Sequence, residues 1–139
     1  MSVSKLLIVC LHLCWTCSLS AQEQETKAVA GQVSAQITFD EQTFDFGEFS
    51  ISKSLEHEHT FEFTNTGGSD LYILQAVSGC GCTTPVYTKV PVKPGEKGRV
   101  VVKYNAKGQN PGPFRKSVTI YTNDPRSYTR LFVKGVKKE

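Results

Sequence analysis

Two closely spaced cysteines give this sequence its clearest chemical potential. Cys80 and Cys82 are separated only by Gly81, and in an extended segment residues i and i+2 lie on the same face. Three interpretations are open. The thiols form a small disulfide, which the short loop would leave strained, weakly stabilising and easily reduced. Alternatively, they bind a metal as a pair of thiolates, or they are inert residues of a tight turn.

Two histidines share the same spacing. His57 and His59 lie at i and i+2 on one face of an expected strand. That strand begins with the histidines, the chain turns at Gly67-Gly68, and the next strand ends just before the cysteines. Both pairs are therefore expected at the same end of the fold, where Cys80, Cys82, His57 and His59 could complete a zinc site or bind copper. The alternative is that His59 packs at the margin of the core and His57 is solvated.

No residue pattern of a common enzyme class is found. The sequence lacks a Gly-x-Ser-x-Gly elbow, a phosphate-binding loop and a His-Glu-x-x-His motif. Glu56, Glu58 and Glu62 share the polar side of one expected strand, which is ordinary for a surface. A Cys/His dyad is the remaining catalytic option, because its members need not be close in sequence. We therefore expect a protein without enzymatic activity and without a cofactor.

The amino-terminal segment is typical of a secretory signal peptide. Lys5 precedes an apolar run over residues 6–19, and small residues appear at and just after its end, at Ser18, Ser20 and Ala21. The run is shorter than the about 20 apolar residues that a transmembrane helix needs. We expect cleavage after Ser20 or Ala21, so that residues 1–21 are removed, with an uncleaved anchor as the alternative.

Export with cleavage of the signal peptide would reduce the number of cysteines in the mature chain. Of the five cysteines, Cys10, Cys14 and Cys17 lie in the leader, and the mature chain would keep only Cys80 and Cys82. None of the leader cysteines has the small-residue context that a lipidation signal requires, so a lipid anchor is the less favoured alternative. We expect the mature protein in the periplasm or cell envelope, without a transmembrane segment. That compartment is oxidising and favours a disulfide.

The mature part of the chain has the period-two alternation of β-strands. Residues 56–64 alternate strictly between polar and aromatic or histidine side chains. Similar short segments, separated by turns, recur up to residue 137, so an antiparallel β-sandwich of 7–8 strands is predicted for residues 37–137. Residues 22–36 are expected to form a flexible tether. The expected strands are 37–40, 44–46, 56–64, 71–77, 86–92 (a short edge strand), 99–104, 117–122 and 129–136. The expected core residues are Phe39, Phe46, Phe61, Phe63, Ile73, Val100, Val102, Val118, Ile120, Leu131 and Val133.

Charge is unevenly distributed along the mature chain. Residues 22–79 carry a net charge of −8 and residues 80–139 a net charge of +10. Acidic early strands paired with basic late strands would account for this division, and a basic face for an anionic partner is the alternative. The whole chain carries only +3, which does not indicate nucleic-acid binding.

Five short motifs follow one another along the mature chain. They are Phe44-Asp45-Phe46-Gly47, His59-Thr60-Phe61-Glu62-Phe63-Thr64-Asn65-Thr66-Gly67, Gly79-Cys80-Gly81-Cys82-Thr83-Thr84-Pro85, Pro94-Gly95 and Thr122-Asn123-Asp124. Together they resemble the bacterial domain-of-unknown-function family 1573 (DUF1573), over about residues 37–136. The resemblance implies an all-β, immunoglobulin-like sandwich of the Hydin type, exported or lipid-anchored, with no established activity. We therefore expect a structural or protein-interaction role with another envelope protein, and a metal-binding or thiol-redox role through the cysteine pair as the alternative.

Overall fold

The computed structural model describes residues 34–139, and this part of the chain contains strands and no helix. The expected signal peptide, residues 1–21, and most of the expected tether lie outside the described residues. No helix within 34–139 is long and apolar enough to cross a membrane. The strands are β1 (Ile37–Phe39), β2 (Thr43–Ser50), β3 (Glu56–Asn65), β4 (Ile73–Ser78), β5 (Thr83–Tyr87), β6 (Lys97–Asn105), β7 (Gly112–Thr122) and β8 (Tyr128–Lys138).

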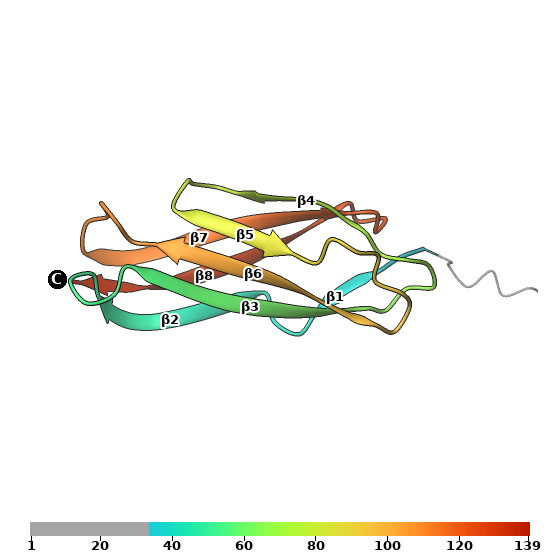
Figure 1. Cartoon of the computed structure of the whole chain (residues 1–139), viewed down its shortest axis with the longest axis horizontal. Coiled ribbons are helices and arrows are strands. Elements are labelled where there is room, and N and C mark those ends of the chain that lie inside the picture. The colour runs from blue at the N-terminus through green and yellow to red at the C-terminus, as the bar shows by residue number, and fades with distance from the viewer. Residues whose placement is uncertain (1–33) are drawn as a thin grey trace, which may run out of the picture.

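The strands form two sheets of four strands that pack face to face (Figure 1). We name them sheet A, in the order β1-β3-β6-β5, and sheet B, in the order β2-β8-β7-β4. Every neighbouring pair is antiparallel except β2 and β8, which run parallel. This arrangement confirms the predicted β-sandwich of 7–8 strands.

Alternation in β3 sets the inner face of sheet A as predicted. Phe61 and Phe63 are fully buried, whereas Glu58 and Glu62 point to solvent. Nine of the eleven expected core residues are buried; Phe46 and Ile73 are partly buried and pack against the core. The core also contains residues that were not expected, namely Ala35, Ile37, Leu71, Val92, Tyr104 and Ala106. Ala35 belongs to the segment expected to be a tether.

Some strand boundaries differ from the predicted ones. A strand was expected at 86–92, but β5 begins at Thr83, directly after the cysteines, and ends at Tyr87. Val92 forms only an isolated bridge with Leu71. Proline lacks the backbone N–H that would donate to a neighbouring strand. Pro85 is tolerated inside β5 because β5 is an edge strand, with no neighbouring strand on its open side. The strand expected at 117–122 is longer, since β7 already begins at Gly112.

A bulge at Gly47 turns a third aromatic residue of β2 toward the core. Gly47 has a φ of 70°, and the register of β2 against β8 shifts between Asp45 and Glu48. Asp45 Oδ1 accepts a hydrogen bond from the Gly47 N–H at 2.8 Å, and this bond lowers the pKa of Asp45. Because the extra residue reverses the alternation, Phe49 faces inward like Phe44 and Phe46. Phe49 packs on the His57 ring at 3.8 Å between centroids.

The division of charge is explained by pairing between strands. Acidic side chains of β3 pair with lysines of β6, and those of β2 pair with lysines of β8, at 2.5–3.9 Å. All these pairs are solvent-exposed, so each contributes little to stability. The prediction that acidic early strands pair with basic late strands is confirmed, and the pairs are Glu58–Lys103, Glu62–Lys97, Asp45–Lys134 and Glu48–Lys138.

One end of the sandwich is organised by the buried Asp124 carboxylate in the β7–β8 turn. Its Oδ2 accepts a hydrogen bond from the Ile37 N–H at 2.9 Å, and Arg126 donates to the carboxylate and to the Ile37 carbonyl. The Asp124 side chain is 3% exposed. The hydrogen bond from Arg126, aided by backbone N–H groups, lowers the pKa of Asp124 to about 2. The turn therefore holds strand β1 through both of the polar backbone groups of Ile37.

Asn65, at the end of β3, is a second buried polar centre at the same end. Its Nδ2 donates to the carbonyls of Ser69 and Val92, both at 2.8 Å, and its Oδ1 accepts from the Gly67 N–H at 3.0 Å. Asn123, next to Asp124, similarly joins the β7–β8 turn to the backbone of Asp70 and Tyr72. Two of the five sequence motifs thus supply the hydrogen bonds that connect the turns at this end.

We predict that Phe63 and Gly98 are energetically coupled. Gly98 lies opposite Phe63 in the register, and a Cβ at Gly98 would collide with the Phe63 ring. Phe63→Ala should lower the free energy of unfolding by about 3–5 kcal/mol, and Glu62→Ala, at its exposed neighbour, by less than about 1 kcal/mol. Gly98→Ala should be destabilising alone and much less so in the Phe63→Ala background. Urea unfolding of the four variants measures this coupling, and strictly additive costs would contradict the packing described.

Candidate functional site

The cysteine pair occupies the tight turn between β4 and β5, the edge strands on one side of the two sheets. Cys80 and Cys82 are joined by a disulfide, with sulfurs 2.02 Å apart and Cα atoms 5.3 Å apart. Both residues are only partly buried. This turn lies at the end of the sandwich where the carboxyl terminus also lies (Figure 1).

Hydrogen bonds hold this turn independently of the sulfur–sulfur bond. Ser78 Oγ donates to the Cys80 carbonyl at 3.0 Å, and the Asn105 N–H donates to the Cys82 carbonyl at 2.8 Å. The Thr83 N–H donates to the Cys80 carbonyl at 3.3 Å. Hydrogen bonds therefore connect the turn to β4 and β6, whereas the disulfide joins two residues within the turn.

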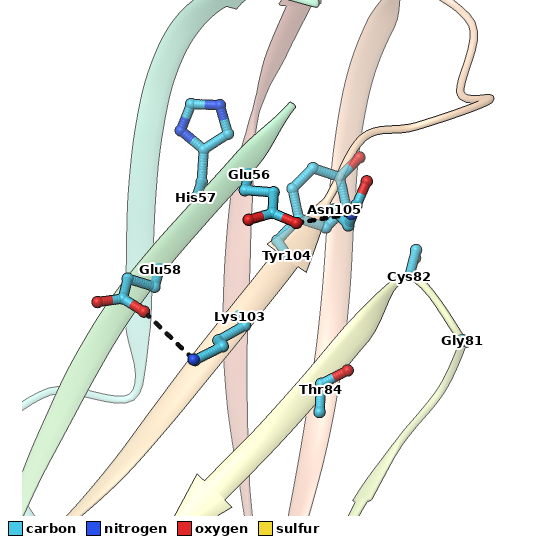
Figure 2. Close-up of a pocket in the computed structure, with 9 residues that line it drawn as sticks. All are labelled: Glu56, His57, Glu58, Gly81, Cys82, Thr84, Lys103, Tyr104 and Asn105. Atoms are coloured by element: carbon cyan, nitrogen blue, oxygen red, sulfur yellow. Dashed lines mark hydrogen bonds and ion pairs between the residues drawn. The ribbon is translucent and has the colours of Figure 1, made fainter. Parts of the chain in front are cut away.

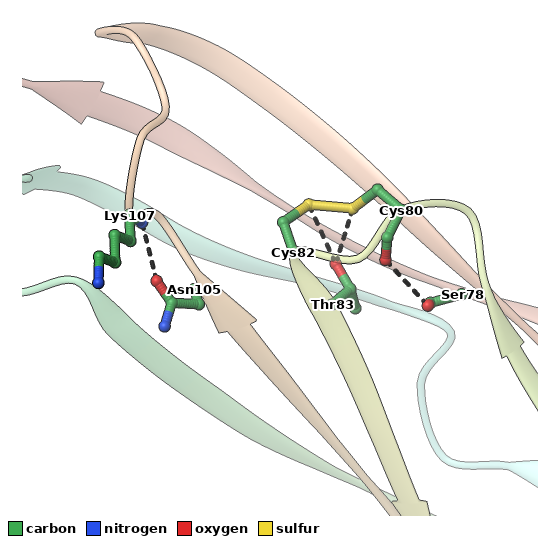
Figure 3. The surroundings of a disulfide bond; sticks show 6 residues. All are labelled: Ser78, Cys80, Cys82, Thr83, Asn105 and Lys107. Carbon is green, nitrogen blue, oxygen red and sulfur yellow. Dashed lines mark hydrogen bonds between the residues drawn. A yellow bond between two sulfur atoms is a disulfide. The ribbon is translucent and has the colours of Figure 1, made fainter.

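Thr83 places a buried hydroxyl beside both sulfurs. Its Oγ1 lies 3.5 Å from Cys80 Sγ and 3.8 Å from Cys82 Sγ (Figure 3). The side chain is directed inward because Thr83 is the first residue of β5 and alternates with the exposed Thr84. A hydroxyl in this position can donate a hydrogen bond to either sulfur.

A polar cleft of about 470 Å³ adjoins the disulfide on the outer face of sheet A. Gly81 and Cys82 form part of its wall (Figure 2). Two pairs of interacting side chains lie along it: Lys103 with Glu58 at 3.9 Å, and Asn105 with Glu56 at 3.2 Å. The remaining lining residues are His57, Thr84 and Tyr104. The cleft thus presents both donors and acceptors next to the disulfide.

The histidines lie at the same end of the sandwich as the cysteines, but they are engaged elsewhere. His59 stacks on Phe44 at 3.6 Å between ring centroids, and its Nε2 contacts Glu41 Oε1 at 2.7 Å. His57 faces the core, where its Nε2 has no hydrogen-bond partner. Strand β6 separates both histidines from β5 and the turn before it.

The structure therefore brings Cys80 and Cys82 together but does not assemble them with His57 and His59. Within residues 34–139, no group of three or more histidine, cysteine or acidic side chains is arranged to hold a metal ion. The register instead aligns His57 with Tyr104 of β6, and Tyr104 with Thr83. The Tyr104 hydroxyl is buried without a partner, and burial raises the pKa of this group.

Sequence reasoning missed Thr83 and a second surface on the outer face of sheet B. Thr83 could have been found, because a hydroxyl residue beside a cysteine pair can reach the sulfurs. The second surface is built from β7 and β8, and no local sequence motif indicates it. We call it the aromatic–arginine face; its residues are Arg115, Tyr121, Tyr128, Arg130 and Phe132, with Leu74 and Val77 of β4 at its border.

The aromatic–arginine face carries two arginines that lie over aromatic rings. The Arg115 guanidinium is 3.8 Å from the centroid of Phe132, and that of Arg130 is 5.6 Å from the centroid of Tyr128. Tyr121 and Tyr128 lie opposite each other in the register of β7 and β8, with their ring centroids 6.1 Å apart. None of the ion pairs formed within residues 34–139 involves Arg115 or Arg130. This face therefore differs from the outer face of sheet A, where opposite charges are paired.

The chain matches the family described as "Protein of unknown function (DUF1573)" over residues 37–136. It belongs to this family, which confirms the resemblance seen in the five motifs. No curated protein matches the chain.

Solved structures share the fold at low sequence identity. A protein of unknown function from Porphyromonas gingivalis W83 is 18% identical, with a TM-score of 0.66 over 78% of this chain and 50% of that one. The ASH / PapD-like domain of human CEP192 is 10% identical, with a TM-score of 0.58 over 77% and 88%. The secreted serine protease VesC from Vibrio cholerae is 13% identical, with a TM-score of 0.52 over 76% and 23%. The chain spans half or less of the first and third of these proteins, and the likeness shows an immunoglobulin-like fold alone.

We predict that removing the disulfide changes the stability of the fold only slightly. The closed loop contains three residues, and the chain-entropy relation gives about 1.6 kcal/mol for such a loop. The Cys80→Ser/Cys82→Ser variant and the reduced wild-type protein should therefore both lose less than about 2 kcal/mol in urea unfolding. Thiol labelling before and after mild reductant confirms the redox state of each sample. A loss above about 4 kcal/mol would instead assign the pair a structural role.

Proposed function

We propose that this protein is an exported, non-enzymatic domain that binds another protein of the cell envelope through the aromatic–arginine face. The observation that carries the proposal is the composition of this face. Tyrosine and arginine are enriched at the energetic centres of protein interfaces, because they combine large contact areas with directed hydrogen bonds. Tyr121 and Tyr128 are both exposed, so their rings are available to a partner.

The proposed location in the envelope rests on the expected signal peptide, residues 1–21. The charged start, the apolar run at residues 6–19 and the small residues that follow are the features of a secretory signal peptide. The small sandwich, whose outer faces are largely exposed, agrees with a domain that acts by contact rather than by enclosing a substrate.

The partner is expected to present carboxylates to the aromatic–arginine face. Arg115 and Arg130 lack an acidic partner within the described chain. Their guanidinium groups are held by contacts with the aromatic rings of Phe132 and Tyr128, respectively. A carboxylate from a partner could accept two parallel hydrogen bonds from either guanidinium. The apolar side chains at the border, Leu74 and Val77, would be covered at the same time.

Photo-cross-linking in the native cell tests this proposal. A photoreactive amino acid at Tyr128 should give one discrete cross-linked product in the envelope fraction, whereas the same residue at Glu62, exposed on the outer face of sheet A, should not. Arg130→Glu should abolish the product, because it would place two carboxylates against each other. Lys97→Glu, a matched charge reversal at an exposed residue of sheet A, should leave it unchanged.

Two outcomes would contradict the proposal. Equal cross-linking from Tyr128 and Glu62 would exclude a specific role of this face. A product whose amino-terminal sequence still begins at Met1 would contradict cleavage after Ser20 or Ala21, and a product confined to the cytoplasm would contradict export.

A further inference from the structure

We propose that the Cys80–Cys82 disulfide is a thiol–disulfide exchange site for thiols of a protein segment that enters the adjacent cleft. In this proposal Cys82 Sγ is attacked, and the Thr83 hydroxyl stabilises the departing Cys80 thiolate. The activity goes beyond the binding function proposed above and uses a different part of the molecule, on sheet A rather than on the outer face of sheet B.

The disulfide is accessible to an incoming thiol. It lies in a turn between two edge strands, and both cysteines are partly exposed. The turn is also held by the hydrogen bonds from Ser78, Asn105 and the Thr83 N–H. Opening the sulfur–sulfur bond therefore does not require the surrounding strands to separate.

The two sulfurs differ in their surroundings, and this difference gives the exchange a direction. Cys82 lines the cleft, whereas Cys80 does not. The Thr83 hydroxyl lies closer to Cys80 Sγ, at 3.5 Å, than to Cys82 Sγ, at 3.8 Å. A thiolate in the cleft meets Cys82 first, and a hydrogen bond from Thr83 favours negative charge on Cys80. A better-stabilised leaving thiolate makes the exchange faster.

The exchange is balanced in two steps. A partner thiolate forms a bond to Cys82 Sγ, the Cys80–Cys82 bond breaks, and its electron pair passes to Cys80 Sγ. A second thiolate of the partner then attacks the partner sulfur of the mixed disulfide and releases the Cys82 thiolate. The partner dithiol has become a disulfide, Cys80 and Cys82 have been reduced to thiols, and the protons of the partner thiols balance those that the two cysteines take up.

The side chains of the cleft define the kind of segment that fits. Glu56 and Glu58 offer acceptors, Lys103 offers donors, and Asn105 and Thr84 offer both. These groups lie on three neighbouring strands of sheet A, along an open surface (Figure 2). An extended polar segment that carries cysteines matches this surface better than a compact apolar ligand does.

Variants of Thr83 test the role of its hydroxyl in the full mature protein. Thr83→Val keeps the shape of the side chain and removes the hydroxyl, so reduction by dithiothreitol should slow about tenfold, the effect of losing one hydrogen bond to a charged group. Thr83→Ser should restore a rate close to that of the wild type. Thr60→Val, at an exposed position of β3 outside the cleft, is the matched control and should not change the rate.

Stability and reactivity are separated by measuring urea unfolding of the same variants. A merely structural role of Thr83 would lower stability and speed up reduction, which is the opposite of the predicted direction. An unchanged rate in Thr83→Val, or failure of Thr83→Ser to restore the rate, would overturn the role of the hydroxyl.

Mass spectrometry identifies the sulfur that is attacked. The oxidised protein is treated briefly with reduced glutathione, a thiol-bearing tripeptide, and the remaining thiols are alkylated in acid. Fragment ions should place glutathione on Cys82 and the alkyl group on Cys80. Glutathione mainly on Cys80, or a disulfide that reacts only after urea has unfolded the protein, would overturn the exchange site.

Discussion

The hydrogen-bonded Asp124 carboxylate is the interaction on which the arrangement of the strands depends. It fixes the backbone of Ile37, 87 residues away in sequence, and thereby holds β1 at the edge of sheet A. The chain then crosses to sheet B, where β2 pairs in parallel with β8. Because Arg126 also donates to the Ile37 carbonyl, the β7–β8 turn ties the first strand to the last hairpin. This tie adds to the three-residue ladder between β1 and β3 and to the flanking hydrogen bonds, in which the Asp40 N–H donates to the Glu62 carbonyl and the Thr66 N–H to the Gln36 carbonyl.

The two ends of the sandwich differ in how their polar groups are bonded. At the Asp124 end, buried polar side chains are satisfied by the backbone of neighbouring turns, as Asn65 is. At the opposite end lie the Cys80–Cys82 turn, the polar cleft and the unpartnered Tyr104 hydroxyl. A fold whose connections are secured at one end can accommodate a partly exposed turn with a disulfide at the other.

The sequence allowed the fold to be predicted where the pattern is local. Strict alternation over β3 located both faces of sheet A, and the acidic and basic halves of the chain correctly indicated paired strands. Features that depend on distant partners could not be predicted. In the sequence Asp124 is an ordinary turn residue, and its bond to Ile37 appears only in the structure. The bulge at Gly47, which brings Phe49 to the inner face, and the position of β5 at Thr83–Tyr87 rather than at 86–92 likewise depend on pairing with β8 and β6.

The same limit applies to the candidate sites. The spacing of Cys80 and Cys82 permitted a disulfide, a metal site or an inert turn. In the structure the two sulfurs are bonded to each other. Their separation from the histidines depends on strand order, because β6 lies between the histidines and the cysteines. The aromatic–arginine face joins residues of β7 and β8 that meet only through their register, so no motif in either strand could reveal it.

The pH dependence of stability in Asp124→Asn tests the central role of this carboxylate most directly. The folded-state pKa of Asp124 is lowered from 3.8 to about 2, so its contribution is complete above about pH 5 and is lost as the pH falls toward 2. In urea unfolding, wild type should exceed the variant by about 2–3 kcal/mol at pH 7, and the difference should shrink steadily below pH 4. All other carboxylates are common to both proteins and cancel in the comparison. A difference that is absent at pH 7, or that stays constant down to pH 2, would contradict the account.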